Sequence, residues 1–255
     1  MFEDQRLDGK VVIVTGATQG LGAAIARRAH ALGASLVITG RDERRGVAVA
    51  EELGARFVAA DLANPSAAET IVGACDRLDG LVNAAGLSTR GTIDDTSVEL
   101  WDRLFAVNAR APFLLTQQAA RLMRGKGGSI VNIITMASHG GEPMLTAYAA
   151  SKGALATFTR NAGYSLQPDR IRVNGLNIGW TATEGENTVQ SGENWLAEAD
   201  ASRPFGRLLR PDDIAPMVTY LLSDAARMVT GSVIDFDQTV HGPYGSHVQP
   251  MEVAT

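Results

Sequence analysis

Short runs rich in valine and isoleucine recur along the chain, separated by longer, alanine-rich stretches. The runs are VVIVT (11–15), LVIT (36–39), RFVAA (56–60), GLVN (80–83), SIVNII (129–134), IRVNGL (171–176) and SVIDF (232–236). Runs of this kind are typical of strands buried on both faces, and the amphipathic stretches of roughly 10 to 20 residues between them fit crossover helices. The alternation predicts a doubly wound α/β fold around a parallel sheet.

The pattern continues without a break, which indicates a single domain over residues 1–255. Hydrophobic side chains make up 45% of the chain, enough to bury a sizeable core, and no Pro/Ser-rich linker or internal repeat interrupts it. The one long irregular segment is 177–204, which carries several Gly and Glu residues with Trp180 and Trp195. A loop of this length in a compact domain is either a functional lid or partly disordered, and we expect a substrate lid.

Composition and charge exclude several classes of partner. The net charge is −5 with scattered Lys and Arg residues, so there is no basic stripe for nucleic acid. The N-terminal MFEDQRLDGK is polar, unlike a signal peptide, and no later segment supplies the roughly 18 apolar residues of a membrane span. We therefore expect a cytoplasmic protein whose partner is a small molecule.

Neither cysteine nor histidine predicts a metal site. Cys75 is the one cysteine, has no CxxC or His/Cys spacing around it, and is interpreted as a small core residue. The four histidines, at 30, 139, 241 and 247, are dispersed along the chain. Among them only His139, directly after Ser138, is a candidate to face a substrate.

The first predicted strand runs directly into TGATQGLG (15–22) and then into a helix-like segment. Glycines at 16, 20 and 22 allow a tight turn and a close approach of the backbone to a pyrophosphate, whose charge the helix N-terminus favours. A phosphate loop of the other common type is excluded because no Lys-Ser/Thr follows the last glycine. The context favours a Rossmann-type dinucleotide site over a merely tight turn.

A tyrosine and a lysine stand four residues apart in YAASK (148–152). Residues at i and i+4 share one helix face, so the Lys152 ammonium can stabilise the phenolate of Tyr148. Free tyrosine titrates near pH 10, so work as a base at neutral pH needs such a cation. The alternative is an exposed tyrosine beside a solvated lysine.

The glycine loop, LVNAAG (81–86), AVNARAPF (106–113) and YAASK occur in the order and spacing of the classical short-chain dehydrogenase/reductase family, which the chain resembles from about Leu7 to Asp237. The resemblance implies an NAD(P)-dependent oxidoreductase that transfers a hydride between a nicotinamide cofactor and a secondary alcohol or ketone. It also implies a homotetramer and chemistry without a metal.

The resemblance assigns four catalytic residues. Asn108 is expected to hold a water that links Lys152 to solvent, although an asparagine there could simply cap or kink a helix. The third catalytic hydroxyl of the family lies thirteen residues before the tyrosine, which is Thr135 here. The alternative is that Thr135 is a buried strand residue and that Ser138 has replaced it. The catalytic set is Asn108, Thr135, Tyr148 and Lys152.

The resemblance also implies a set of cofactor contacts. Asp61 is expected at the adenine, unless it is a plain helix cap, and Asn83 is expected to shape the cleft. Thr183 matches the threonine that contacts the carboxamide. The full set is Gly16, Thr18, Gln19, Gly20, Leu21, Gly22, Arg41, Asp61, Leu62, Asn83, Ala84, Gly86, Tyr148, Lys152, Ile178 and Thr183.

The chain departs from the family pattern in two places, and the residues at the end of the second strand bear on the choice of cofactor. Ile178 replaces a proline that would have fixed the backbone before Thr183, and FDQTVHG (236–242) replaces the usual Asp-Gly-Gly. At the end of the second strand, where a carboxylate would select NAD, the chain has Gly40 and then Arg41, with Arg44 and Arg45 beyond. A guanidinium suits a 2′-phosphate, so NADP(H) is favoured; with the arginines solvated, NAD(H) is the alternative.

The substrate is the least constrained part. Polar groups mixed with two indoles suit a sugar or polyol, although these groups could equally face water. A 3-oxoacyl thioester and other ketones are alternatives. A catalytically silent regulator would be expected to lose the tyrosine or the lysine, and a methyltransferase would not need them. The polar residues of the segment are Glu184, Glu186, Asn187, Gln190, Glu193, Asn194 and Glu198.

Overall fold

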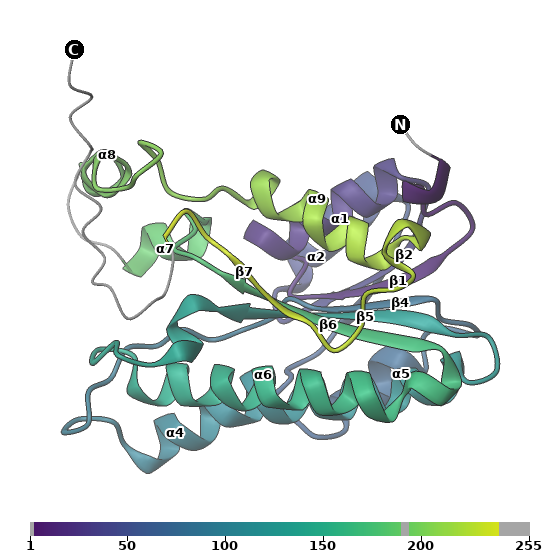
Figure 1. The fold of residues 1–255 in the computed structure, drawn as a ribbon, viewed down its shortest axis with the longest axis horizontal. Coiled ribbons are helices and arrows are strands. Elements are labelled where there is room, and N and C mark those ends of the chain that lie inside the picture. Colours follow the sequence, from purple (N-terminus) through teal and green to yellow (C-terminus); the bar gives the residue numbers. More distant parts are fainter. Residues whose placement is uncertain (1–2, 190–193, 240–255) are drawn as a thin grey trace.

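The computed structural model describes residues 3–189 and 194–239, and in them seven parallel strands form one sheet (Figure 1). The strand order is β3-β2-β1-β4-β5-β6-β7. This confirms the predicted doubly wound parallel fold. The strands are β1 (Val11–Thr15), β2 (Ser35–Gly40), β3 (Arg56–Ala59), β4 (Gly80–Asn83), β5 (Gly128–Thr135), β6 (Ile171–Ile178) and β7 (Val233–Phe236).

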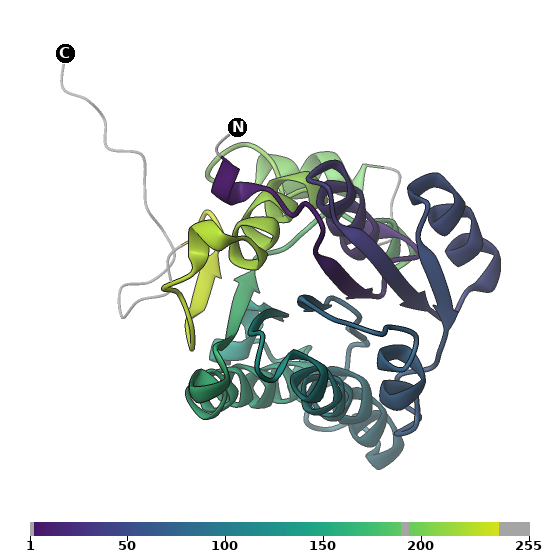
Figure 2. The same ribbon diagram turned by 90° about the vertical axis from the view of Figure 1, so that its right-hand side faces the viewer.

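Helices cover both faces of the sheet and enclose two hydrophobic cores (Figures 1 and 2). One face carries α1 (Gly20–Ala31), α2 (Glu43–Leu53) and α9 (Pro211–Leu222). The other face carries α3 (Ala67–Val72), α4 (Val98–Phe105), α5 (Ala111–Met123) and α6 (Thr146–Ser165), with a π-helical turn at Ala106–Arg110 between α4 and α5. Short 3₁₀ turns lie at Glu3–Gln5, Met136–His139, Gln167–Asp169 and Asp224–Ala226. None of the helices in the described residues is both long and apolar enough to cross a bilayer.

Two expectations about local structure need correction. The outer strands β3 and β7 are only partly buried, because each has a neighbour on one side alone. In its described residues, the segment 177–204 is not irregular throughout: its first two residues complete β6, and it contains α7 (Glu184–Val189) and α8 (Trp195–Ala201). Strand and helix formation here satisfies backbone hydrogen bonds that a loop would leave to water.

The sheet order reverses direction between β1 and β4, and this decides where a ligand can bind. The chain leaves β1 toward α1 on one face and leaves β4 toward α4 on the other. A crevice therefore opens beyond the carboxyl ends of these two strands, which is where open α/β sheets bind their ligands.

Helix α6 lies very close to the segment that precedes β7. A Cβ atom built on Gly163 would lie 2.7 Å from the Cα atom of Gly231, a contact that real side chains do not make. Ten residues earlier in the same helix, a Cβ atom on Gly153 would lie 3.5 Å from the Ser138 carbonyl oxygen, an ordinary contact. The two glycines therefore have different reasons to be present.

Substituting each glycine by alanine tests this difference. Gly163→Ala is expected to lower the free energy of unfolding by about 1–3 kcal/mol, because the helix must move away from Gly231. Gly153→Ala is expected to leave it unchanged or raise it by up to about 1 kcal/mol, because alanine is the better helix former. Urea unfolding of both variants measures the two effects, and equal values would show that α6 is not tightly packed at Gly163.

Candidate active site

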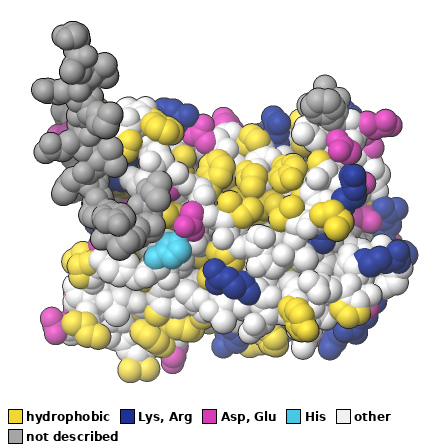
Figure 3. All heavy atoms as spheres, in the orientation of Figure 1, with side chains coloured by type: hydrophobic (Ala, Val, Ile, Leu, Met, Phe, Trp, Pro, Cys, Tyr) yellow, Lys and Arg dark blue, Asp and Glu magenta, His cyan; other side chains and the backbone are white. Residues whose placement is uncertain are grey.

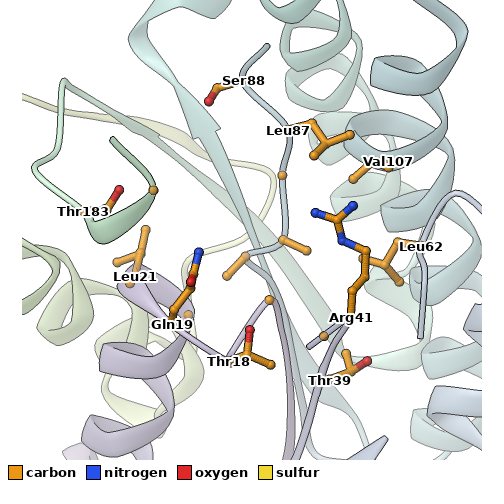
Figure 4. A pocket seen from close by; sticks show the side chains of 18 of the residues that line it. Thr18, Gln19, Leu21, Thr39, Arg41, Leu62, Leu87, Ser88, Val107 and Thr183 are labelled. Carbon is orange, nitrogen blue, oxygen red and sulfur yellow. The ribbon is translucent and has the colours of Figure 1, made fainter. Parts of the chain in front are cut away.

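A cavity of about 340 Å³ opens beyond the carboxyl ends of the strands. Loops that follow β1, β2, β3, β4 and β6 form its wall (Figure 4). Twelve of the residues assigned from the sequence to the cofactor line it, while Asn83, Tyr148, Lys152 and Ile178 lie outside its lining. The twelve are Gly16, Thr18, Gln19, Gly20, Leu21, Gly22, Arg41, Asp61, Leu62, Ala84, Gly86 and Thr183.

The glycine loop has the shape that a pyrophosphate requires. Gly16 has a φ of +68° and Gly20 one of +54°, a region that disfavours other residues. A Cβ atom on Gly22 would lie 2.3 Å from the carbonyl oxygen of Gly16, so the loop and α1 can close together only at a glycine. No side chain caps the N-terminus of α1, so its N–H groups remain available to an anion. The residues present fit a dinucleotide.

Among the arginines that follow β2, Arg41 is the one that lines the cavity. Figure 4 shows its side chain reaching through the pocket toward Val107, where its charge helps to lower the pKa of Asp61. Arg45 lies 3.4 Å from Asp42 and 4.0 Å from Glu184, so its charge is already engaged. The guanidinium of Arg41 is thus placed to meet an anionic group of a ligand.

Asp61 is held at the edge of the same cavity. Its Oδ1 accepts a hydrogen bond from the Ala63 N–H at 3.0 Å, and its Oδ2 accepts one from Arg103 at 2.9 Å. These contacts, the Ala63 N–H first, hold the pKa of the carboxyl below its usual value. Helix α3 is preceded by Ser66, so Asp61 is not its cap.

The tyrosine and lysine project from the first turns of α6. Lys152 is buried and donates a hydrogen bond to the Ile133 carbonyl oxygen at 2.8 Å. Burial lowers the pKa of Lys152 to about 8. Burial also raises the pKa of Tyr148; a hydrogen bond with the Thr135 side chain opposes that rise, and the charge of Glu186 adds to it.

The two candidate hydroxyls have different partners. Thr135 ends β5; its hydroxyl accepts a hydrogen bond from the Ala137 N–H at 3.3 Å and lies beside the phenol of Tyr148, whose pKa it lowers. Ser138 lies in the following 3₁₀ turn and donates to Oδ1 of Asn177 at 3.2 Å. In turn, Asn177 donates to Asp235 at 2.7 Å. The structure therefore brings Thr135, and not Ser138, into contact with the tyrosine.

Asn108 lies within the π-helical turn. Pro112 has no N–H to give to the carbonyl group four residues earlier, which is that of Asn108, so the α-helical ladder cannot continue there. The Asn108 amide accepts from the Leu87 N–H and donates to the Leu87 carbonyl, both at 2.9 Å, and also donates to Ser151 at 3.0 Å. A Cβ atom on Gly86 would lie 3.4 Å from both Asn108 Oδ1 and Lys152 Nζ, so these two groups are close together.

Asn83 and Ile178 hold the strands that carry the site residues in place. Asn83 donates to Asn132 at 2.8 Å, and Asn132 donates to Thr159 of α6 at 2.9 Å. Ile178 pairs in register with Thr135, so β6 continues to the end of β5 although the family's proline is missing. Thr183 accepts a hydrogen bond from the Glu186 N–H at 3.2 Å, which fixes its hydroxyl at the start of α7.

Some contributors were not found from the sequence. Arg103 and Ser151 carried no signal, since their partners lie far away along the chain. Glu186 was one of several acidic residues in the segment after β6, and it lines the cavity together with Asp61. Gln190 and Glu193 lie outside the described residues, as do His241 and His247. Within the described ranges, no group of three His, Cys, Asp or Glu side chains could hold a metal ion.

Comparison with known proteins gives consistent matches over nearly the whole chain. A family model described as enoyl-(acyl carrier protein) reductase matches residues 16–241. Cyclopentanol dehydrogenase from a Comamonas strain is 34% identical over 242 residues, which cover 91% of this chain and 97% of the relative. L-xylulose reductase from Bos taurus is 34% identical over 238 residues, covering 92% and 97%.

A solved structure extends the comparison to three dimensions. It is that of a proposed NAD(P)-dependent gluconate 5-dehydrogenase from Beutenbergia cavernae with bound NADP at low occupancy, with a TM-score of 0.83 and 32% identity over 92% of this chain and 98% of that one. These matches show that the chain belongs to the classical short-chain dehydrogenase/reductase family and is an NAD(P)-dependent oxidoreductase that transfers a hydride between its cofactor and an alcohol or ketone.

Proposed function

We propose that this enzyme interconverts a secondary alcohol that carries further hydroxyl groups, such as a sugar or polyol, with the corresponding ketone, and that it prefers NADP(H). The observation that carries the proposal is that Thr135, at the end of β5, lies beside Tyr148, one helical turn from buried Lys152. When bound, the nicotinamide accepts or supplies the hydride.

In this proposal, Tyr148 is the proton carrier. During oxidation its phenolate takes the proton of the substrate hydroxyl, and during reduction its phenol returns one. Thr135, which lies beside the phenol and lowers its pKa, orients the substrate oxygen and stabilises charge that develops there. Lys152 favours the phenolate through its positive charge. Asn108 holds the loop at Leu87 and binds the water that links Lys152 to solvent.

The substrate class rests on the groups that face the reaction centre. Glu186 lines the cavity and acts on Tyr148, and the indole N–H of Trp180 donates to its carboxylate at 2.9 Å. A carboxylate in this place can accept hydrogen bonds from substrate hydroxyls. The Trp180 ring beside it stacks on Trp195 at 6.4 Å and carries the Arg203 guanidinium 5.1 Å from its centroid. The likeness to L-xylulose reductase supports a polyol, and the likeness to cyclopentanol dehydrogenase makes a plain cyclic alcohol the second candidate.

We further propose that the segment after β6 acts as a lid, and that the protein is a cytoplasmic homotetramer.

Two surfaces support the oligomer. The edge strand β7 has partly buried Val233, Ile234 and Phe236, and hydrophobic side chains gather over the region of α9 and β7 (Figure 3). On the opposite side, a groove between α5 and α6 contains Phe113 and Phe158, whose rings meet edge to face at 5.7 Å. Both surfaces suit a second copy of the chain.

Purified enzyme tested on a panel of polyols, sugar alcohols and cyclopentanol is expected to oxidise a polyol best. With that substrate, kcat/KM should be about tenfold to a hundredfold higher with NADP⁺ than with NAD⁺, because Arg41 forms a charge-assisted bond to the 2′-phosphate. Arg41→Ala should remove this preference through KM for NADP⁺, with Arg44→Ala as the matched control. If cyclopentanol proved the best substrate, the proposed substrate class would be wrong. A preference for NAD⁺ would overturn the cofactor assignment.

Replacing each candidate hydroxyl separately tests the site assignment. Thr135→Ala is expected to lower kcat by about two orders of magnitude or more, as removal of an oxyanion-type donor does, while Thr135→Ser should keep most of the rate. Ser138→Ala should have a much smaller effect, because its hydroxyl bonds Asn177 instead. A crippled Ser138→Ala enzyme beside an active Thr135→Ala enzyme would reverse the assignment.

The buried lysine should set the pH dependence of reduction. Reduction needs Tyr148 protonated and Lys152 charged, and the lysine loses its proton as the pH rises through about 8. The kcat/KM for ketone reduction is therefore expected to be level on the acid side of that pKa and to fall on its alkaline side. In Lys152→Arg, whose guanidinium keeps its proton, the fall should move to a higher pH even if the rate is lower. A wild-type profile that stays level to about pH 10 would contradict the assignment.

A further inference from the structure

The glycine at the end of β2 is not required by its backbone. Gly40 lies in a regular strand, pairs with Ala59 and has no positive φ. A Cβ atom built on it, however, would lie 2.4 Å from Cγ2 of Thr18, with the threonine Oγ1 at 3.2 Å and Cβ at 3.4 Å. The methyl group of Thr18 therefore fills the space that any side chain at position 40 would need.

Hydrogen bonds hold the backbones that carry the two residues side by side. The loop is tied to β2 by a hydrogen bond from the Ala17 N–H to the Thr39 carbonyl at 3.1 Å, and Gly40 accepts from the Ala60 N–H at 3.0 Å. Both Thr18 and Gly40 line the cavity, and Figure 4 shows Thr18 pointing into it from the loop before α1. Removing only the γ atoms of Thr18 would leave its Cβ 3.4 Å from the new Cβ, which is an ordinary contact.

We propose that Thr18 is a second specificity-determining residue for the cofactor, which acts by keeping position 40 free of a side chain. A carboxylate at the end of this strand would accept hydrogen bonds from a ribose 2′-hydroxyl and repel a 2′-phosphate. With the Thr18 side chain in its present rotamer, a side chain at position 40 would collide with its methyl group, so the space beside Arg41 stays open for the phosphate. This inference rests on the proposed preference for NADP(H) and adds that Thr18 and position 40 can change only together.

The test is a double-mutant cycle with Thr18→Ala, Gly40→Asp and the combined variant. Dissociation constants for NADPH and NADH are measured by the fluorescence of the bound nicotinamide, and melting temperatures are recorded without cofactor. Gly40→Asp alone should bind NADPH at least about tenfold more weakly without gaining NADH affinity, and it should melt at a lower temperature. In the Thr18→Ala background the same aspartate should raise NADH affinity by about tenfold and cost much less in melting temperature.

A parallel cycle with Gly40→Ala separates space from charge and serves if Gly40→Asp does not fold. Gly40→Ala should lower the melting temperature in the parent but much less beside Thr18→Ala. Equal losses in the two backgrounds, or a Gly40→Asp protein that binds NADH as tightly as the combined variant, would overturn the proposal. If the parent binds NADH more tightly than NADPH, the cofactor assignment fails, while the melting temperatures still report separately whether the two positions are coupled.

Discussion

The junction between β1 and β4 is the contact on which the site depends. The hydroxyl of Thr15, the last residue of β1, accepts hydrogen bonds from the N–H groups of Ala84 and Ala85, both at 3.1 Å. A Cβ atom on Gly16 would lie 2.8 Å from the Cα atom of Ala85, so the two strand ends touch through their backbones. The glycine loop and the wall that carries Gly86 are thereby held together at one edge of the cavity.

Buried polar side chains extend this rigidity to the chemistry. The series from Asn83 through Asn132 to Thr159 joins two strands to α6, and each link is a hydrogen bond of 2.8–2.9 Å between buried groups. Lys152 lies about two turns nearer the start of that helix and is anchored to the Ile133 carbonyl. Because unpaired polar groups are costly in such an interior, the network favours one arrangement of α6 over the alternatives.

Much of this arrangement could be predicted from the sequence, and the reasons are local. Parallel strands read as apolar runs, and the spacing of Tyr148 and Lys152 places both on one helix face whatever the surroundings. The helices of the segment after β6 were missed, because their Gly and Glu content resembles that of a loop. The pairs Asp61–Arg103 and Thr18–Gly40 could not be foreseen either, since each joins segments that only the folded chain brings together.

The amide of Asn108 behaves toward Leu87 as a neighbouring strand would. It accepts from the N–H and donates to the carbonyl of the same residue, so a side chain replaces one rung of a sheet ladder. Only a group with an acceptor and a donor in fixed planar relation can do this, which an isosteric carboxylate lacks. The position is therefore as chemically demanding as a catalytic one, because both donors of the amide are used within the chain and one acceptor site of its oxygen remains.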